Sequence, residues 1–372
     1  MRVLISGGGS GGHVTPAVAI AGHLRDKNIE VAFAGTKNGI ESKILPREGY
    51  KLHFLKVRSF SRKKKISFAN MDAAIKAVTS QFAAKRIIKN FAPDVVVGTG
   101  GYVSWPVLSV AAKLKIPSLI HEQNALPGVT NKLLAKTADK VMISFEESRK
   151  YFKDGGSEKF IYTGNPVKPE YFAIDQKEAK KELSPGRFMI LSVGGSMGAE
   201  KLNEVLIDFM DQYSKNKDMT HYHVTGSRGY KEYSELFESK NLNTCGYLHL
   251  EEYIYDICKY YAAADIVICR AGALTLAELA VLKKPAILIP SPYVAENHQY
   301  KNAEALAGQG AALIVEEKDL CAKALIDKIE ELTKNPAKLS DMAHNIGKFA
   351  AYDTLDKIYD IIMGAKNKNE AK

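Results

Sequence analysis

Short apolar runs recur along the chain, and most of them lead into glycine or a polar cluster before a helical pattern begins. Continuous apolar runs of this length are typical of strands that are buried on both faces. Their alternation with helical segments predicts an α/β fold with parallel sheets. The expected strands are 3–6, 31–35, 94–98, 117–120, 140–144 and 160–166, then 188–193, 221–226, 265–269 and 286–290.

The strand–helix scheme restarts after a proline-flanked segment, TGNPVKPEYF, near the middle of the chain. Pro166 and Pro169 fix an extended path there, which suits a linker. A chain of 372 residues is also too long for one ordinary core. We expect two Rossmann-like domains, 1–165 and 166–350, with a cleft between their strand ends. A last helix at about 351–365 is expected to pack on the first domain, followed by a frayed tail.

The composition is that of a soluble globular protein, with 46% hydrophobic residues, 25% charged residues and a mean hydropathy of −0.18. Residues 95–112 carry no charge, but three glycines and Pro106 interrupt them. We therefore expect a buried strand, a glycine turn and a helix start rather than a membrane span. The chain starts with a strand that runs into a glycine loop, so no signal peptide is expected. The cysteines lack a C-x-x-C pair, which indicates reduced, buried thiols: Cys245, Cys258, Cys269 and Cys321.

All of the net charge of +10 is concentrated in one segment. Residues 49–93 hold eleven Lys and Arg against one acid, Asp72. The basic residues of this segment lie between positions 51 and 89. A segment of this kind is expected to bind an anionic surface. The same segment contains apolar residues spaced by three and four, which predicts an apolar stripe along a helix. This stripe either faces the core or lies on an anionic bilayer. Its residues are Phe68, Met71, Ile75, Val78 and Phe82. No recognition motif or stacking pattern suggests nucleic acid as a partner.

Glycine-rich turns follow the first strand of each half. The first has the G-x-G-x-x-G spacing of a dinucleotide site, but the second strand ends in Thr36 and Lys37 without the ribose-binding carboxylate. His13 follows this loop directly, which a nicotinamide site does not require. In the second turn, 194–199, backbone amides and Ser196 are placed to bind a phosphate. Two purely structural turns are the simpler alternative.

Polar clusters follow three further strands. In 269–280, Glu278 either caps a helix N-terminus or accepts hydrogen bonds from vicinal hydroxyls, as on a ribose. In 118–131, Asn124 and Asn131 are candidates for binding sugar hydroxyls or an acetamide, whereas His121 and Glu122 are equally consistent with a buried pair that holds the loop. The cluster 295–303 either binds hydroxyls or caps the next helix: His298, Gln299 and Asn302.

Over residues 2–307 the chain resembles the MurG family, the undecaprenyl-diphospho-muramoyl-pentapeptide β-N-acetylglucosaminyltransferases of bacterial cell-wall synthesis. The resemblance rests on GGGSGGHVTPAVAIA, GTGGYVSWP, HEQNALPGVTNK, TGNPV, GGSMGAEKLNE, CRAGALTLAELA and ENHQYKNA. It implies the GT-B fold and inverting transfer of N-acetylglucosamine from UDP-GlcNAc to the C4 hydroxyl of a lipid-linked N-acetylmuramoyl-pentapeptide, which forms lipid II. It also implies peripheral attachment at the cytoplasmic face of the membrane. No D-x-D stretch is present, so no cofactor and no required divalent metal are expected.

The resemblance also implies a set of site residues. Glu278 would bind the ribose, Ser196 a phosphate, the backbone around Ile254 the uracil, and Gln299 the sugar. The full donor set is Ser10, Gly11, Gly12, Asn124, Lys168, Ser196, Ile254, Ala273, Leu274, Thr275, Leu276, Ala277, Glu278 and Gln299. Lys168 stands where many relatives have arginine, and His298 where some have glutamine, which leaves both contacts open. The candidates for the acceptor or its loops are Gly100, Tyr102, Glu122 and Asn131.

His13 is the candidate general base, because imidazole titrates near neutral pH and this residue would face the cleft. The alternative is that it only hydrogen-bonds its own glycine loop. Three other functions stay open from the residues: a GT-B glycosyltransferase acting on another lipid, a UDP-GlcNAc 2-epimerase, and a nucleotide-binding module without catalysis.

Overall fold

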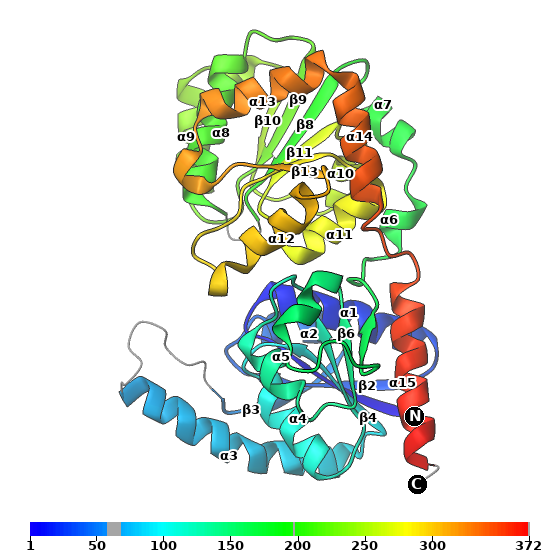
Figure 1. The fold of residues 1–372 in the computed structure, drawn as a ribbon. Helices are drawn as coiled ribbons and strands as arrows, with labels where there is room; N and C mark the ends of the chain where they lie inside the picture. Colours follow the sequence, from blue (N-terminus) through cyan, green and yellow to red (C-terminus); the bar gives the residue numbers. More distant parts are fainter. Residues whose placement is uncertain (58–67, 196–197, 371–372) are drawn as a thin grey trace. The chain divides into compact units, whose positions relative to one another are not determined.

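The computed structural model describes residues 1–57, 68–195 and 198–370, and the side chains of all of these except 68–78 and 368–370. The chain divides into two compact units (Figure 1). Unit 1 comprises Met1–Val167 and Asp353–Lys372, and unit 2 comprises Lys168–Tyr352. The division after Val167 lies in the segment with the paired prolines.

Unit 1 is built on a seven-stranded parallel sheet with the order β3-β2-β1-β4-β5-β6-β7. Its strands are β1 (Arg2–Gly7), β2 (Glu30–Thr36), β3 (Lys51–Leu55), β4 (Val95–Gly100), β5 (Ser118–Glu122), β6 (Lys140–Ile143) and β7 (Phe160–Tyr162). Its helices are α1 (Gly11–Asp26), α2 (Glu41–Arg47), α3 (Phe68–Phe91), α4 (Ser104–Lys113), α5 (Val129–Leu134), the short η1 (Glu146–Tyr151) and α15 (Thr354–Glu370).

Helices cover both faces of this sheet, because successive strand side chains point to opposite sides. In β1, Val3 and Ile5 pack with α1, whereas Leu4 packs with α3 and α4 on the other face. Two buried residues of the C-terminal helix, Ile358 and Ile362, join the core on the α1 side. The last helix of the chain therefore contributes to the core of unit 1. Figure 1 shows α15 running alongside this unit.

Unit 2 is built on a six-stranded parallel sheet with the order β10-β9-β8-β11-β12-β13. Its strands are β8 (Phe188–Val193), β9 (Met219–Val224), β10 (Leu248–Glu251), β11 (Ile266–Cys269), β12 (Ala286–Leu288) and β13 (Ala312–Ile314). Its helices are α6 (Glu170–Ala173), α7 (Gln176–Leu183), α8 (Glu200–Tyr213), α9 (Tyr230–Ser239), α10 (Ile257–Ala263), α11 (Ala273–Leu282), α12 (His298–Ala307), α13 (Ala322–Lys334) and α14 (Pro336–Gly347). Three single turns, η2 (Leu242–Thr244), η3 (Ala295–Asn297) and η4 (Glu317–Asp319), complete it.

The strand order reverses at the same place in both sheets, between β1 and β4 and between β8 and β11. At such a switch point the connections leave the neighbouring strands toward opposite faces, which opens a crevice at the carboxyl edge of the sheet. The first glycine turn and the turn 99–103 flank this point in unit 1. The second glycine turn and residues 270–272 flank it in unit 2. The topology thus places the polar motifs at the edges where α/β proteins bind ligands.

The predicted parallel α/β architecture with two Rossmann-like units is confirmed, and the strands that the sequence did not indicate lie at sheet edges. β3 and β10 are partly exposed and contain polar residues, so they lack the continuous apolar runs of the central strands. β13 was not predicted either, although it lies in the short apolar run 311–315. The uncharged stretch 95–112 forms β4, a turn and most of α4, as expected. In the described part of the chain, no helix is long and apolar enough to span a membrane.

Two smaller expectations were wrong. Cys321 is exposed, because it stands at the N-terminal boundary of the surface helix α13, although Cys258 and Cys269 are buried. The expected frayed tail is helical as far as Glu370, since no proline or glycine interrupts α15 after Gly364.

Candidate active site

The turn after β1 and the turn after β4 pack directly on each other. A Cβ on Gly7 would lie 1.9 Å from Thr99 Oγ1, and one on Gly101 would lie 2.1 Å from the carbonyl oxygen of Gly8. Gly101 also has a φ of +80°, so glycine is required there for both space and backbone conformation. The Thr99 hydroxyl donates a 2.8 Å hydrogen bond to the His13 carbonyl. These contacts hold the first turn of α1 against the end of β4.

The His13 side chain has one ring nitrogen engaged. Nδ1 lies 3.1 Å from the Thr99 carbonyl oxygen and 3.3 Å from Gln123 Oε1. Both partners are acceptors, so Nδ1 carries the proton, and Nε2 of the neutral ring has an unshared pair. Nε2 has no hydrogen-bond partner among the described residues, and the side chain is half-buried. This is the protonation geometry that a general base needs.

A buried carboxylate, Glu41, lies under the first glycine turn. Its oxygens accept hydrogen bonds from the Gly9 amide at 3.1 Å, the Thr36 amide at 2.9 Å and the Thr36 hydroxyl at 2.6 Å. Glu41 is the first residue of α2, so it reaches the end of β2 from five residues further along the chain. Its negative charge, with the Gly9 amide already engaged, disfavours a phosphate against Gly9. This carboxylate was not predicted, because Glu41 lies five residues beyond the strand end that it contacts.

The side chain of Glu122 is fully used within its own loop. It accepts hydrogen bonds from the Asn124 amide (2.9 Å), Asn124 Nδ2 (3.2 Å), the Gly128 amide (3.0 Å) and Asn131 Nδ2 (2.8 Å). Glu122 and Asn131 are both buried. Of the two interpretations left open by the sequence, these contacts favour the loop-holding one for Glu122 and Asn131. Asn124 remains half-buried at the same edge of the sheet.

His121 is buried beside this loop, and its burial lowers its pKa to about 4. Nε2 donates to the Gly164 carbonyl at 3.0 Å, and Nδ1 accepts from Gln123 Nε2 at 3.0 Å. Gln123, which was not among the predicted site residues, therefore lies between His121 and His13. Among the other predicted residues, Tyr102 lies against Gly9, where an added Cβ would be 2.8 Å from the ring.

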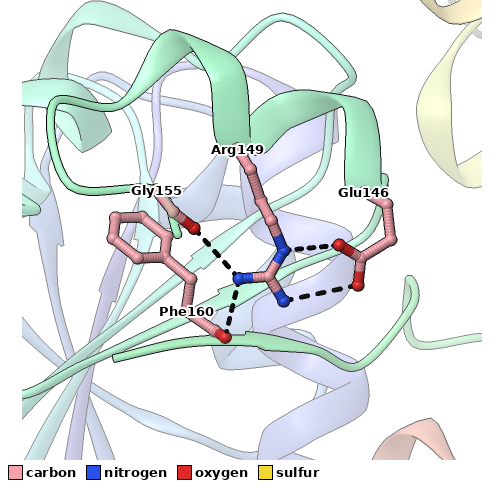
Figure 2. Close-up of polar contacts among 4 residues, drawn as sticks. All are labelled: Glu146, Arg149, Gly155 and Phe160. Atoms are coloured by element: carbon pink, nitrogen blue, oxygen red, sulfur yellow. Dashed lines mark hydrogen bonds and ion pairs between the residues drawn. The ribbon is translucent and has the colours of Figure 1, made fainter. Parts of the chain in front are cut away.

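Arg149 holds the strand that leads to Gly164. Its guanidinium donates to the carbonyl oxygens of Gly155 and Phe160, each at 3.0 Å, and pairs with Glu146 (Figure 2). The Phe160 contact fixes the start of β7, four residues before the carbonyl that His121 binds. The Thr354 hydroxyl of α15 donates a further bond of 2.7 Å to the Thr163 carbonyl, so the C-terminal helix also restrains this segment.

In unit 2, a cleft of about 870 Å³ lies at the carboxyl edge of the sheet, beside the second glycine turn. Gly194, Ala199 and Arg270 line it, together with Ser291 and Gln299. The Arg270 guanidinium is oriented by Glu317 Oε2 at 2.5 Å and by the Ile289 carbonyl at 3.1 Å. Gln299 Oε1 accepts from the Ser291 amide at 2.8 Å, which directs the orientation of its side-chain amide.

The predicted ribose-binding stretch forms the first two turns of α11. Leu276 is a core side chain, so only its backbone is placed to meet a ligand. Burial raises the pKa of Glu278 to about 7, against the lowering effects of a hydrogen bond from Tyr171 and the charge of Lys168. Lys168 itself is exposed, and Ile254 lies in the loop after β10 at the same edge of the sheet. Residues 273–278 are not among those that line the 870 Å³ cleft. Ser196 falls outside the described residues.

Both units match models of one enzyme family. The N-terminal domain of glycosyltransferase family 28 matches residues 3–143, and the C-terminal domain of the same family matches residues 189–358. A Thermoanaerobacter protein (strain X514) is 44% identical over 366 residues, which cover 97% of this chain and 99% of that protein. It is named UDP-N-acetylglucosamine–N-acetylmuramyl-(pentapeptide) pyrophosphoryl-undecaprenol N-acetylglucosamine transferase.

Solved structures agree with this match. Acinetobacter baumannii MurG superposes with a TM-score of 0.77 at 28% identity, over 98% of this chain and 99% of that one. The UDP-GlcNAc 2-epimerase of Neisseria meningitidis, solved with bound UDP-GlcNAc, superposes with a TM-score of 0.67 at 15% identity, over 98% of this chain and all of that one. At that identity the second likeness concerns the fold alone.

The buried His121 makes the stability of unit 1 depend on pH. Its folded pKa of about 4 lies below the 6.5 of an exposed histidine, so below about pH 6.5 the unfolded chain binds a proton that the folded chain does not. The contribution of His121 to the free energy of unfolding is fully present above this pH and is lost as the pH decreases toward 4. At about pH 5 the free energy of unfolding is lower by about 2 kcal/mol. Urea unfolding followed by the single tryptophan, Trp105 of α4, reports on unit 1. We expect His121→Gln to flatten this dependence, and an unchanged slope in the variant would contradict the assignment.

Proposed function

This chain belongs to the MurG family of family 28 glycosyltransferases, and on that basis we propose how its residues carry out the transfer. The enzyme moves N-acetylglucosamine from UDP-GlcNAc to the undecaprenyl-diphosphate-linked N-acetylmuramoyl-pentapeptide and so forms lipid II. In the proposal, unit 1 binds the acceptor and supplies the base, and unit 2 binds the donor. One observation carries it: His13 Nδ1 lies within hydrogen-bond distance of two acceptors, which favours the proton on Nδ1 and leaves Nε2 free to accept one.

His13 Nε2 takes the proton of the acceptor C4 hydroxyl as its oxygen attacks C1 of the donor sugar. The attack comes from the face opposite the diphosphate, so the configuration at C1 inverts and UDP leaves. The imidazolium that forms is stabilised at Nδ1 by the Thr99 carbonyl and Gln123 Oε1. Tyr102 and Asn124, at the same edge of the sheet, are the proposed contacts to the sugars, while Ser10, Gly11 and Gly12 border the donor.

Unit 2 is proposed to hold the UDP part of the donor. The helix N-termini after β8 and β11 face the diphosphate, where aligned amide dipoles stabilise the charge that develops on the leaving group. Glu278 accepts hydrogen bonds from the two ribose hydroxyls, the backbone at Ile254 binds the uracil, and Gln299 contacts the sugar. Lys168 adds a point charge beside this site.

Replacing His13 tests the proposed base. His13→Ala is expected to lower kcat by about 10²- to 10⁴-fold, the usual contribution of a positioned base. Because the proposed contacts to UDP are all in unit 2 and His13 is not one of the proposed donor contacts, the affinity for UDP-GlcNAc measured by calorimetry is expected to stay unchanged. His344→Ala, which removes an exposed histidine of α14, is the matched control.

The same assay distinguishes the alternatives, with labelled UDP-GlcNAc and a short-chain analogue of the lipid acceptor. A His13→Ala enzyme with the wild-type rate would refute the role of the base. Epimerised donor without transfer, or transfer to another lipid only, would overturn the assigned reaction.

The Glu278 carboxyl makes donor binding depend on pH. With a pKa of about 7, the ionised form that accepts both ribose hydroxyls falls from about nine-tenths at pH 8 to about one-tenth at pH 6. We expect the affinity for UDP-GlcNAc to fall roughly 10-fold over this range. UDP-GlcNAc is the appropriate probe because its diphosphate diester does not titrate there, unlike UDP. Calorimetry on Glu278→Gln should show weaker binding without this pH dependence; equal slopes in both proteins would contradict the role of Glu278.

We also propose that the basic segment of unit 1 attaches the enzyme to the anionic cytoplasmic face of the membrane. Phe82 of α3 is 74% exposed, and Lys85 and Arg86 are exposed on the same helical face one turn later. Phe54 of the edge strand β3 is also exposed. An exposed phenylalanine is unexpected if the stripe faces the core, and it supports the membrane interpretation. The other four stripe side chains, Phe68, Met71, Ile75 and Val78, lie outside the described ones.

Vesicle sedimentation tests this attachment. Binding to vesicles containing phosphatidylglycerol is expected, and it should weaken with salt and be absent on phosphatidylcholine alone. At about 1 kcal/mol per basic residue, the double variant Lys85→Glu/Arg86→Glu should bind at least about 10-fold more weakly. Lys177→Glu/Lys181→Glu on α7 of unit 2 makes the same change in net charge and is expected to bind like the wild type. Salt-independent binding, or equal losses in both variants, would count against the proposal.

A further inference from the structure

We propose that Gln123 is a positioning residue for the catalytic base, held in one orientation by the buried His121 so that it keeps the proton of His13 on Nδ1. This inference rests on the proposed role of His13 as the base. It extends that role to a chain of hydrogen bonds that runs from the Gly164 carbonyl through His121 and Gln123 to the His13 ring.

The chain of hydrogen bonds starts at the Gly164 carbonyl oxygen, which can accept a hydrogen bond but cannot donate one. His121 Nε2 lies 3.0 Å from the Gly164 carbonyl oxygen, so Nε2 carries a proton. Its ring is completely buried, and burial favours the neutral form. A neutral ring with a proton on Nε2 has none on Nδ1. Nδ1 of His121 is therefore an acceptor.

This acceptor determines how the Gln123 amide is turned. Gln123 Nε2 lies 3.0 Å from His121 Nδ1 and 2.9 Å from the His121 carbonyl oxygen. Both of these atoms accept, so the NH₂ group of the amide must face His121 and the oxygen must face away from it. The opposite orientation would place Oε1 against two acceptors in a buried site, which is strongly unfavourable.

The oxygen of Gln123 then faces His13 Nδ1 at 3.3 Å. The Thr99 carbonyl oxygen lies 3.1 Å from the same nitrogen. His13 Nδ1 therefore faces two acceptors, one from β4 and one from the loop after β5. The proton of the neutral imidazole consequently stays on Nδ1, and the lone pair is on Nε2. When Nε2 takes the proton of the acceptor hydroxyl, the same two oxygens stabilise the imidazolium. Gln123 therefore acts on the reaction through His13 and has no contact with the reacting atoms in the proposal.

The wild-type enzyme offers the first test, which requires no substitution in the network. Two-bond ¹H–¹⁵N spectra of the histidine-labelled, unliganded enzyme at neutral pH identify the protonated nitrogen of each ring. The signals of His13 and His121 are assigned by their loss in His13→Gln and His121→Gln. We expect His13 to be protonated on Nδ1 and His121 on Nε2. A His13 proton on Nε2, or an exchanging mixture of both forms, would overturn the proposal.

The second test removes the glutamine oxygen with little change in side-chain length. Gln123→Met is expected to shift the His13 signals toward a mixture of the two tautomers. It should lower kcat by about 10- to 100-fold, as loss of an orienting partner typically does, and leave the KM for UDP-GlcNAc unchanged. Gln212→Met, at an exposed position on α8 of unit 2, is the matched control and should change neither the spectrum nor kcat.

A double-variant cycle separates positioning from a merely structural role. If Gln123 acts through His13, Gln123→Met lowers kcat in the wild type but causes less than a twofold further loss in His13→Ala. The same loss in both backgrounds, or a wild-type His13 spectrum in Gln123→Met, would overturn the inference. Failure of the proposed function would give a different result, namely full activity of His13→Ala. The tautomer measurement does not depend on that activity assay.

Discussion

The contact between the turn after β1 and the turn after β4 is the constraint on which the rest of the site in unit 1 depends. The reversed strand order makes these two turns neighbours, and glycine lets their backbones meet where a Cβ on Gly7 or Gly101 would overlap the opposite turn. The same close approach leaves His13 with its carbonyl bonded to the Thr99 hydroxyl and its ring bonded to the Thr99 carbonyl. The proposed base is thus held through backbone atoms of both turns, in addition to its contact with Gln123.

Two buried carboxylates organise the loops around this contact. Glu41 joins the glycine turn to the end of β2, and Glu122 joins the end of β5 to the start of α5. Each accepts several amide or hydroxyl donors, which is how an ionised group is kept in a protein interior at an acceptable cost. These hydrogen bonds are all made within unit 1, so both side chains hold the loops around the contact between the two turns.

The two units share a strand order but differ in the chemistry at the switch point. Unit 1 presents an imidazole whose Nδ1 faces two acceptors, whereas unit 2 presents two helix N-termini, an oriented arginine and the Glu278 carboxyl. A repeated fold therefore does not imply a repeated function, because function resides in the side chains at the strand ends. The C-terminal helix joins the two ends of the chain in one unit, since Ile358, Ile362 and Thr354 are buried against elements of residues 1–167.

The sequence by itself determined the parallel α/β architecture, the glycine turns and the position of each polar motif at a strand end, because these depend on residues close together in the chain. Three of the four edge strands, β3, β10 and β13, were not predicted. Polar residues interrupt the apolar pattern of β3 and β10, and the apolar run that contains β13 is short. Tertiary structure alone revealed the contacts of Glu41 and Gln123. Gln123 meets a ring 110 positions away, and His121 meets a carbonyl 43 positions away. No local pattern contains such pairs, because the sheet that brings them together forms from strands that are distant in the sequence.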